Sequence, residues 1–514
     1  MKKNFFNIFT VAALVVVLLP ACDNGLEELN KNPDAYTEVI PEYLFTKAQL
    51  DAVNNNYFGS AALTIGGSMQ HFATYKEVPA AGDKYFNEGY SYSHFTTAYP
   101  NEVNEIQEVI RAVSEKPEDV NKLSIARIWR VYIMHRLTDL YGDVPYSEAG
   151  QGLTSKNFTP KYDEQASIYA DMLQELEQAA LALNPAFPSM GNSDLIYGGN
   201  VEKWKKFAYS LMLRLGMRLT KADAATAKTW VEKAIAGGVI TSESDIALIG
   251  YIDGSQVASR NPIAQALLVG DYINPQSEDN VEGGKLAKTF IDHLKNTRDP
   301  RLNVISVVWV KNATGVYVAD TATALQQGMP NAAFNSRPGN FNTFSEPHPG
   351  TILKYDAPLL VLSSAEVNLL LAEAVLRGWY GGNAAELYKA AVGAGMRNWA
   401  YFGAAGAISA DKINAYMALN PYPAAGTMEE QMKVIQTEKW VSLFLDEYEI
   451  YANWRRTGYP ELIPTNYPGN LTGGTIPRRF VLPPAEENIN GENFHEAINR
   501  QGPNRLTSRV WWDK

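Results

Sequence analysis

The sequence predicts an all-α fold built of tetratricopeptide-like helix pairs, with long irregular ligand-binding loops. Apolar residues recur at spacings of three and four over several long segments, which is the periodicity of helices that bury one face. Residues 365–398 indicate two antiparallel helices in one 34-residue unit, with alanines where the helices would touch. Strand-like sequence is sparse and limited to 304–310, so a helical fold is favoured.

Helices in the first half of the chain are predicted at 123–140, 163–183, 201–219 and 224–236. Gly142 is expected to end the first helix, and Gly237 with Gly238 the fourth, because glycine readily adopts the left-handed conformation that follows a helix. Asp163 is expected to cap the second, since a carboxylate can accept a hydrogen bond from a free N–H group of the first turn.

The helix pair in the second half has clear predicted start signals. Ser363 and Glu366 have the spacing of a capping box at the start of the first helix. Asn383 is expected to cap the second helix. A last long helix is predicted over 428–454, ending where 455–458 break the pattern.

The N-terminus has the features of a bacterial export signal with a lipid attachment site. Lys2 and Lys3 precede the apolar run 11–19, which is too short to span a bilayer. Cys22, the only cysteine, follows Leu-Pro-Ala, as in a lipobox. We expect Cys22 to be lipidated after removal of the signal, although an ordinary secretory signal with a chance cysteine is the alternative.

Composition limits the classes of partner and chemistry. A chain with a single cysteine can form no internal disulfide. Removing residues 1–21 takes away two lysines and no acid, so the formal charge changes from −11 to −13. This charge argues against nucleic acid as a partner and against electrostatic binding to an anionic membrane, so a lipid anchor would be the membrane contact.

No motif predicts catalysis, a bound metal or a cofactor. The six histidines are scattered and form no zinc-type pattern. The acid pairs Asp139 with Asp143 and Glu447 with Glu449 could be imagined as glycosidase carboxylates, but spacing in sequence cannot establish the separation that such chemistry needs. We interpret them as solvated or capping carboxylates, and expect a protein that is not an enzyme.

Short motifs follow one another in a distinctive order along nearly the whole mature chain. They are 137–149 (LTDLYGDVPYSEA), 160–163 (PKYD), 194–199 (DLIYGG), 210–214 (SLMLR), 299–301 (DPR), 372–374 (AEA), 438–440 (EKW), 454–460 (WRRTGYP) and 477–480 (PRRF). This order resembles the SusD/RagB family of nutrient-binding outer-membrane lipoproteins of Bacteroidetes.

The resemblance implies a fold and a function. It implies a SusD-like α-α superhelix that is lipid-anchored at the surface of the outer membrane and covers a SusC-like TonB-dependent transporter. Family members capture oligosaccharides, or peptides in some cases, and catalyse no reaction. A peptide ligand or a purely structural role beside the transporter are therefore the alternatives to oligosaccharide capture.

The resemblance and the helix pattern together suggest a domain plan. Residues 1–21 are the signal peptide, 22–41 a lipid-anchored tether and 42–514 a single SusD-like domain. Within that domain we expect tetratricopeptide-like units at about 123–240 and 363–456, and a loop-rich binding region at about 66–100 and 250–360.

Aromatic side chains in these loops are the candidate ligand contacts, because flat apolar faces can cover sugar rings. The stretch 85–99 has six aromatics in 15 positions. The first candidates are Tyr85, Tyr92, Phe95, Tyr99 and Asn101. Phe95 and Tyr99, four apart, could equally belong to a helix core.

A second aromatic cluster lies in the middle loops and consists of Trp309, Tyr317, Phe341 and Phe344. Trp309, Phe341 and Phe344 complete the predicted ligand site. A tryptophan in a long loop is either a platform for ligand or a plug over the core, and the sequence leaves both interpretations open.

Overall fold

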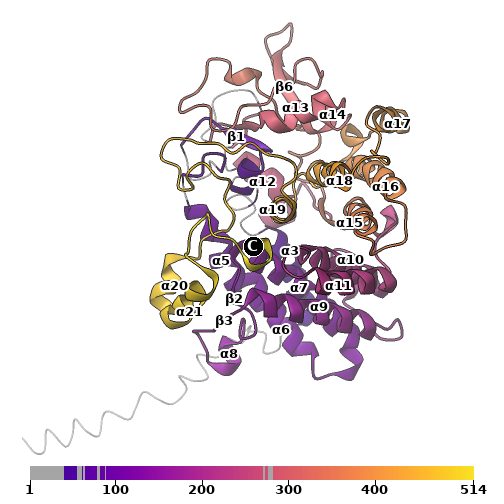
Figure 1. Ribbon diagram of the computed structural model, residues 1–514, viewed down its shortest axis with the longest axis vertical. Helices are drawn as coiled ribbons and strands as arrows, with labels where there is room; N and C mark the ends of the chain where they lie inside the picture. The colour runs from indigo at the N-terminus through magenta and orange to yellow at the C-terminus, as the bar shows by residue number, and fades with distance from the viewer. Residues whose placement is uncertain are drawn as a thin grey trace, which may run out of the picture. The chain divides into compact units, whose positions relative to one another are not determined.

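Helices packed in pairs make up most of the molecule (Figure 1). The computed structural model describes residues 40–54, 61, 64–77, 82–86, 88–269, 272–275 and 282–514. Pro41–Lys514 forms one unit. The predicted signal, Cys22 and nearly all of the predicted tether lie outside the described residues, so their predictions are not addressed by the structure.

The long helices fall mainly where apolar periodicity predicts them. They are α3 (Pro41–Asn54), α6 (Asn104–Val113), α7 (Val120–Tyr141), α9 (Gln165–Ala182), α10 (Val201–Arg218), α11 (Ala224–Gly237), α15 (Ser364–Leu376), α16 (Ala384–Arg397), α17 (Ala410–Leu419), α18 (Met428–Ser442), α19 (Glu447–Thr457) and α21 (Gly491–Gln501).

Shorter helices and single helical turns connect them. They are α4 (Gly66–Ser68), α5 (Ser93–Ala98), α8 (Gly152–Ser155), α12 (Pro262–Val269), α13 (Lys288–Asn296), α14 (Leu302–Ile305), α20 (Pro484–Ile489), η2 (Gly89–Tyr92), η3 (Tyr99–Val103) and η8 (Phe341–Thr343).

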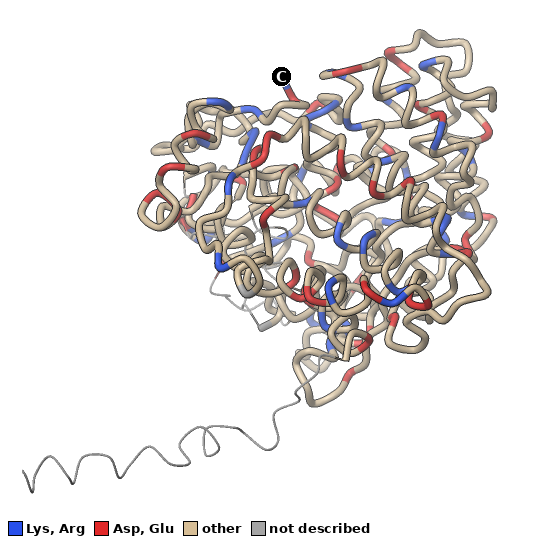
Figure 2. The backbone as a smooth tube through the Cα atoms, turned by 90° about the horizontal axis from the view of Figure 1, so that it is seen from below, with Lys and Arg blue, Asp and Glu red and all other residues tan. Residues whose placement is uncertain are grey.

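Helix pairs stack on one another to form the core. α7 packs on α9, α10 on α11 and α15 on α16, while contacts of α9 with α10, of α10 with α15 and of α15 with α18 join successive pairs. The predicted all-α, tetratricopeptide-like fold class is therefore confirmed. Acidic and basic residues are interspersed along these helices in Figure 2. Among the described helices, none is both long and apolar enough to cross a bilayer.

The buried face of α7 illustrates why the apolar pattern was informative. Trp129 and Tyr132 are fully buried and stacked, with ring centres 4.3 Å apart. The Trp129 indole N–H donates to the Ala48 carbonyl of α3 at 3.1 Å, so its polar atom is satisfied within the core. α7 ends as predicted at Gly142, whose φ is +83° and whose N–H bonds the Thr138 carbonyl.

The prediction that Asp163 caps the second helix is wrong. α9 begins at Gln165, and Asp163 belongs to the short strand β3 (Tyr162–Asp163) beside β2 (Val144–Pro145). The Asp163 carboxylate accepts from the backbone N–H groups of Tyr146 and Ser147. The cap comes instead from Asp143, whose Oδ1 accepts from the Gln165 N–H at 3.0 Å.

The capping box predicted from Ser363 and Glu366 is also wrong. Ser363 occupies the N-cap position of α15, but its side chain makes no capping hydrogen bond. The Glu366 carboxylate is fully buried and binds the Arg214 guanidinium, with Nε–Oε1 2.9 Å and Nη2–Oε2 2.6 Å. Glu366 therefore serves as the counter-ion of the buried Arg214 and is not available for a capping box.

The single helix predicted over 428–454 is two helices. α18 ends at Ser442 and α19 starts at Glu447. Leu445 between them adopts φ +87°, a conformation that a right-handed helix cannot contain. Asn383 caps α16 as predicted, because its side chain accepts from the Ala385 N–H at 2.9 Å.

Small sheets lie among the loops. β1 (Phe72–Thr74) pairs with β5 (Gly284–Leu286), β6 (Ser306–Lys311) lies between β7 (Tyr317–Asp320) and β8 (Glu346–Pro347), and β4 (Ala247–Ile249) pairs with β9 (Leu359–Leu362). The strand expected over 304–310 corresponds to β6, preceded by the short helix α14.

Candidate functional site

The loops predicted to form a binding region are joined to one another in the structure. β1, from the first loop, pairs with β5, from the second. Asn331 donates to the Phe72 carbonyl at 2.9 Å, and the Ala332 N–H donates to Asp83 at 2.8 Å. Segments some 250 residues apart therefore build one loop region, with β6 at its end in Figure 1.

Trp309 lies on β6 with its side chain half-buried and fixed in place. The indole N–H donates to Glu346 Oε2 at 2.9 Å. Glu346 is itself fully buried and paired with the buried Lys285, whose Nζ lies 2.5 Å from Oε1. Burial raises the pKa of Glu346, and Lys285 and Trp309 oppose this by stabilising the charged carboxylate. The hydrogen bond to Glu346 therefore fixes the orientation of the Trp309 ring in the absence of ligand.

Register places Trp309 beside a second aromatic and a cation. Trp309 pairs with Ala319 and Lys311 with Tyr317 across the β6–β7 ladder. Because strand side chains alternate and directly opposed residues share a face, Trp309, Lys311 and Tyr317 lie on one face of this ribbon. The Lys311 Nζ is 5.1 Å from the Tyr317 ring centre. We call these three residues the ribbon face.

The ribbon face has the chemistry that a sugar requires. Trp309 and Tyr317 are each half-buried, so part of each ring remains accessible, while Lys311 is exposed. Apolar ring surface can cover the C–H faces of a pyranose, and the ammonium group can donate to hydroxyl or carbonyl oxygens. The second interpretation of Trp309, a plug over the core, accounts for the buried half of its side chain but not for the exposed half.

The other two rings of the middle cluster are core residues. Phe341 is fully buried and meets Tyr75 edge to face, with ring centres 5.1 Å apart. Lys285 Nζ lies 4.3 Å from the Phe341 ring centre, so this phenylalanine supports the ion pair below Trp309. Phe344 is 2 % exposed. These buried rings offer no face to a ligand in this structure.

The predicted residues of the first cluster lie apart from the ribbon face. Figure 1 places α5 in the middle of the molecule beside β2, well away from β6. Phe95 is 4 % exposed and packs on Tyr99 at 4.7 Å and on Tyr141 at 5.4 Å. The Tyr99 hydroxyl donates to the Pro145 carbonyl at 2.7 Å. For this pair the helix-core alternative describes the observed packing.

The remaining candidates of that cluster differ in exposure. Tyr85 is 3 % exposed, and its carbonyl accepts from the Leu471 N–H. Asn101 is half-buried and donates to the Thr97 carbonyl at 2.8 Å. Tyr92 is half-buried in η2. Tyr85, Phe95 and Tyr99 take part in core packing, while Tyr92 and Asn101 stay half-buried, so the five residues do not form one exposed aromatic surface.

Sequence reasoning missed two residues that complete the ribbon face and its support. Lys311 could have been found by extending the predicted strand 304–310 by one residue, because it lies two residues after Trp309 and would share its face. Glu346 could not have been predicted, because it lies 37 positions from Trp309 and no local sequence pattern indicates their contact.

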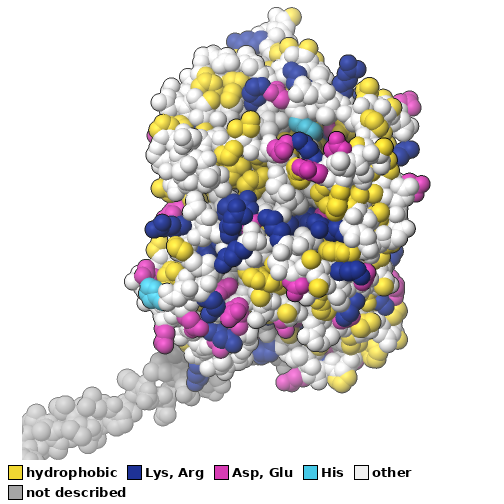
Figure 3. All heavy atoms as spheres, in the orientation of Figure 1, with side chains coloured by type: hydrophobic (Ala, Val, Ile, Leu, Met, Phe, Trp, Pro, Cys, Tyr) yellow, Lys and Arg dark blue, Asp and Glu magenta, His cyan; other side chains and the backbone are white. Residues whose placement is uncertain are grey.

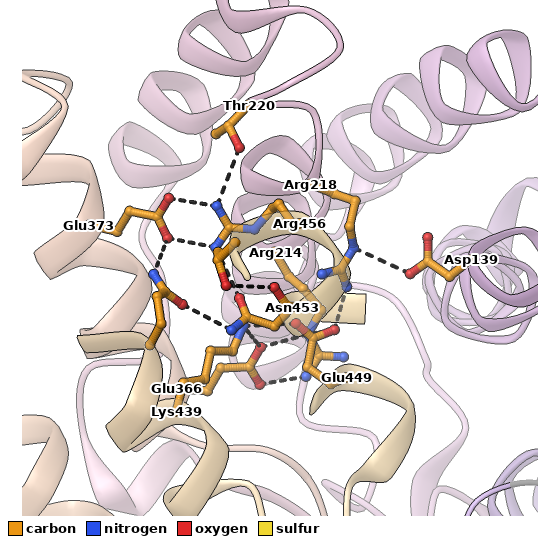
Figure 4. A network of polar contacts seen from close by, with 12 residues as sticks. Asp139, Arg214, Arg218, Thr220, Glu366, Glu373, Lys439, Glu449, Asn453 and Arg456 are labelled. Carbon is orange, nitrogen blue, oxygen red and sulfur yellow. Dashed lines mark hydrogen bonds and ion pairs between the residues drawn. The ribbon is translucent and has the colours of Figure 1, made fainter. Parts of the chain in front are cut away.

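Several motif residues form a buried ion network between the helix pairs (Figure 4). Arg214 and Arg218 of α10 both pair with Glu449 of α19, and Lys439 of α18 contacts Glu449 at 2.8 Å. Three cations around it keep the pKa of Glu449 well below its usual range, although burial alone would raise it. These residues join helices and do not face an open site.

The carboxylates considered for glycosidase chemistry are buried too. Asp139 Oδ1 accepts from the Trp512 indole N–H at 2.9 Å and from the Tyr169 hydroxyl. Glu447 is fully buried, with an oxygen 2.9 Å from His71 Nδ1. Each is buried and has a partner inside the fold. Within the described residues, no three His, Cys, Asp or Glu side chains converge to hold a metal ion.

Comparison with protein families gives one match. A family model described as starch-binding and associating with the outer membrane matches residues 33–483, which is most of the chain. No curated protein matches.

Solved structures with the same fold are numerous. A chitin-binding protein is 32 % identical, with a TM-score of 0.80 over 92 % of this chain and 99 % of that one. A SusD-like protein from Bacteroidetes is 26 % identical, with a TM-score of 0.81 over 93 % and 100 %. A SusD homologue from Bacteroides uniformis is 25 % identical, with a TM-score of 0.75 over 93 % and 100 %.

Proposed function

The chain belongs to the SusD-like family of starch-binding proteins associating with the outer membrane, and we propose that it captures an oligosaccharide at the cell surface and delivers it to a SusC-like TonB-dependent transporter. In this proposal the lipid on Cys22 is the membrane anchor. The protein binds and hands over its ligand without chemical change.

The ribbon face carries the proposal that the ligand is a glycan. Its two rings and one ammonium group combine apolar contact area with a hydrogen-bond donor, and the Glu346–Lys285 pair fixes the indole beforehand. A preset platform loses little conformational entropy on binding, which favours affinity for a flexible sugar chain. The 32 % identity to a chitin-binding protein supports N-acetylglucosamine oligomers as the first ligands to test.

Titration calorimetry of Trp309→Ala tests this proposal. With chitohexaose and maltohexaose as probes, we expect the protein to bind at least one, and the substitution to weaken that binding about tenfold, equivalent to about 1.4 kcal/mol. The matched control is Val318→Ala, because Val318 is exposed on the opposite face of the same ribbon. Equal affinities for wild type, control and Trp309→Ala would exclude the ribbon face as the site.

A further inference from the structure

A second hollow lies where α13 meets α16, α17 and α18. Two cavities of about 650 and 530 Å³ share Tyr388, Tyr416, Asn420 and Pro421 in their linings, so they adjoin one another. Figure 3 shows charged side chains of both signs gathered around a hollow between α13 and α18. We call it the helix groove. Its two cavities fall within the range of about 300–1,000 Å³ that is typical of ligand sites.

Uncharged hydrogen-bonding groups line much of the helix groove. Asn296 and Thr289 come from α13, Asn414 and Asn420 from α17 and the turn after it, and Thr437 from α18. Asn296 and Asn414 are exposed. Amide and hydroxyl groups can both donate and accept, as sugar hydroxyls do.

The charges of the helix groove are largely neutralised within the chain. Asp292 pairs with Lys288, Lys433 with Glu461, and Glu438 with Arg301 at 2.7 Å. His293 has its pKa lowered by burial, so it is uncharged at neutral pH. Among the described residues of the lining, Lys389 is the one charged side chain without an ion pair. A charged ligand would therefore find few counter-charges here.

Aromatic rings provide the apolar part of the helix groove. Tyr422 is half-buried, packs on Tyr388 with ring centres 5.3 Å apart, and donates its hydroxyl to Gln431 at 2.9 Å. Tyr388 and Tyr416 are 7 % and 5 % exposed and lie at the base. A ring held on two sides in this way presents a fixed edge and part of a face to a bound molecule.

We propose that the helix groove is a second binding site for a neutral oligosaccharide. Paired charges, amide and hydroxyl groups and an anchored tyrosine together match an uncharged polyhydroxylated chain. They do not match an acidic glycan or a charged peptide, which would need free counter-charges. The inference rests on the proposed function only for the class of ligand, since the two sites share no described residue.

A matched pair of tryptophan substitutions on α17 tests the second site. Ala418 lines the helix groove and is exposed, so Ala418→Trp should fill it. Ala415 is exposed on the same helix and does not line the groove, so Ala415→Trp is the control. Asn414→Ala serves as a second groove variant that removes an amide without adding bulk. Thermal melting establishes that each variant is folded.

Each variant is made in the full chain with Trp309→Ala and is applied to an array of neutral and acidic glycans. We expect Trp309→Ala alone to retain binding to one or more neutral glycans. Adding Ala418→Trp should weaken this residual binding about tenfold or more, equivalent to about 1.4 kcal/mol. Adding Ala415→Trp should leave it unchanged.

The remaining outcomes distinguish the two proposals. If Trp309→Ala abolishes all binding, the helix groove is not a site and the ribbon face stands. If Ala418→Trp and Ala415→Trp behave alike, the helix groove is not a site. If Ala418→Trp in the wild-type background abolishes binding that Trp309→Ala leaves intact, the helix groove stands and the ribbon face does not. Residual binding restricted to acidic glycans would overturn the neutral-ligand inference. Absence of any glycan binding by the wild type would overturn both.

Discussion

Glu373 is a fully buried carboxylate held by two arginines. Arg456 of α19 donates to both of its oxygens at 2.6 Å, and Arg377 donates to one at 2.8 Å. Gln436 of α18 donates to the same group at 2.7 Å. Burial alone would raise the pKa of Glu373, but Arg456 and Arg377 lower it from 4.5 to about 2. One side chain of α15 thus joins three helices through charge-assisted hydrogen bonds.

This lowered pKa makes stability depend on pH. The charged Glu373 stabilises the folded protein fully above pH 4.5, where its carboxylate is ionised in both the folded and the unfolded chain. This stabilisation is lost as the pH falls towards 2. A difference of this size corresponds to about 3 kcal/mol at pH 7. We expect Glu373→Gln to lower the free energy of unfolding by about 3 kcal/mol at pH 7, and the deficit to narrow by about 2 kcal/mol at pH 3. Urea denaturation at both pH values measures this.

The control for that substitution is Glu386→Gln, which changes an exposed glutamate on α16. It should alter the free energy of unfolding by less than about 0.5 kcal/mol at either pH. An equal deficit for Glu373→Gln at pH 7 and at pH 3 would mean that the Glu373 pKa is not depressed in the folded protein.

Which aromatic residues are exposed could not be predicted from composition. Trp309 and Phe341 both fall in a segment predicted as a long loop, yet Trp309 is half-buried and Phe341 is fully buried. The difference arises from contacts distant in sequence, such as Phe341 with Tyr75. A high frequency of aromatic residues, as along 85–99, is therefore compatible with a binding surface and equally with core packing. Tyr85 and Phe95 pack in the core.

At the level of elements, the start of α18 has the capping box that α15 lacks. Thr427 accepts from the Glu430 N–H, and the Glu430 carboxylate accepts from the Thr427 N–H at 2.7 Å. We expect Thr427→Ala to lower the free energy of unfolding by about 1 kcal/mol. Ser363→Ala should cost a few tenths of a kcal/mol at most, because Ser363 makes no capping hydrogen bond.

Chemical denaturation of both variants measures this pair. A loss of about 1 kcal/mol for Ser363→Ala would indicate that the box predicted from sequence exists in the protein. A negligible effect of Thr427→Ala would show that the start of α18 is held by tertiary packing alone.

Helix positions could be predicted well because the apolar periodicity of a helix is contained in its own residues and does not depend on distant contacts. α7, α10 and α11 fall within a few residues of the predicted segments, and Gly142 and Gly238, both with positive φ, follow the last residues of α7 and α11. The break between α18 and α19 could not be predicted, since Leu445 is neither glycine nor proline and its φ of +87° is set by its surroundings. Asp163 and Glu366 were misread because Asp163 accepts from Tyr146 and Ser147 and Glu366 binds Arg214, contacts that no local sequence pattern shows.

On the scale of the whole molecule, two surfaces on different parts of one unit are proposed to bind glycan. The ribbon face belongs to the loop region that the sequence marked as functional. The helix groove lies between the helix pairs and α13. It could not be predicted from the sequence, because its lining comes from elements up to about 170 residues apart. The helix pairs thus form the scaffold. The sites were harder to predict than the fold because the segments that line each site are far apart in the sequence.

A crystal structure of the full mature chain with a bound oligosaccharide tests the central claim most directly. The oligosaccharide is the one that binds best in calorimetry, and the protein is saturated with it before crystallisation. The account predicts a sugar ring lying against Trp309 and Tyr317, within reach of Lys311. A saturated complex in which the ribbon face carries no sugar while another surface does would contradict the account.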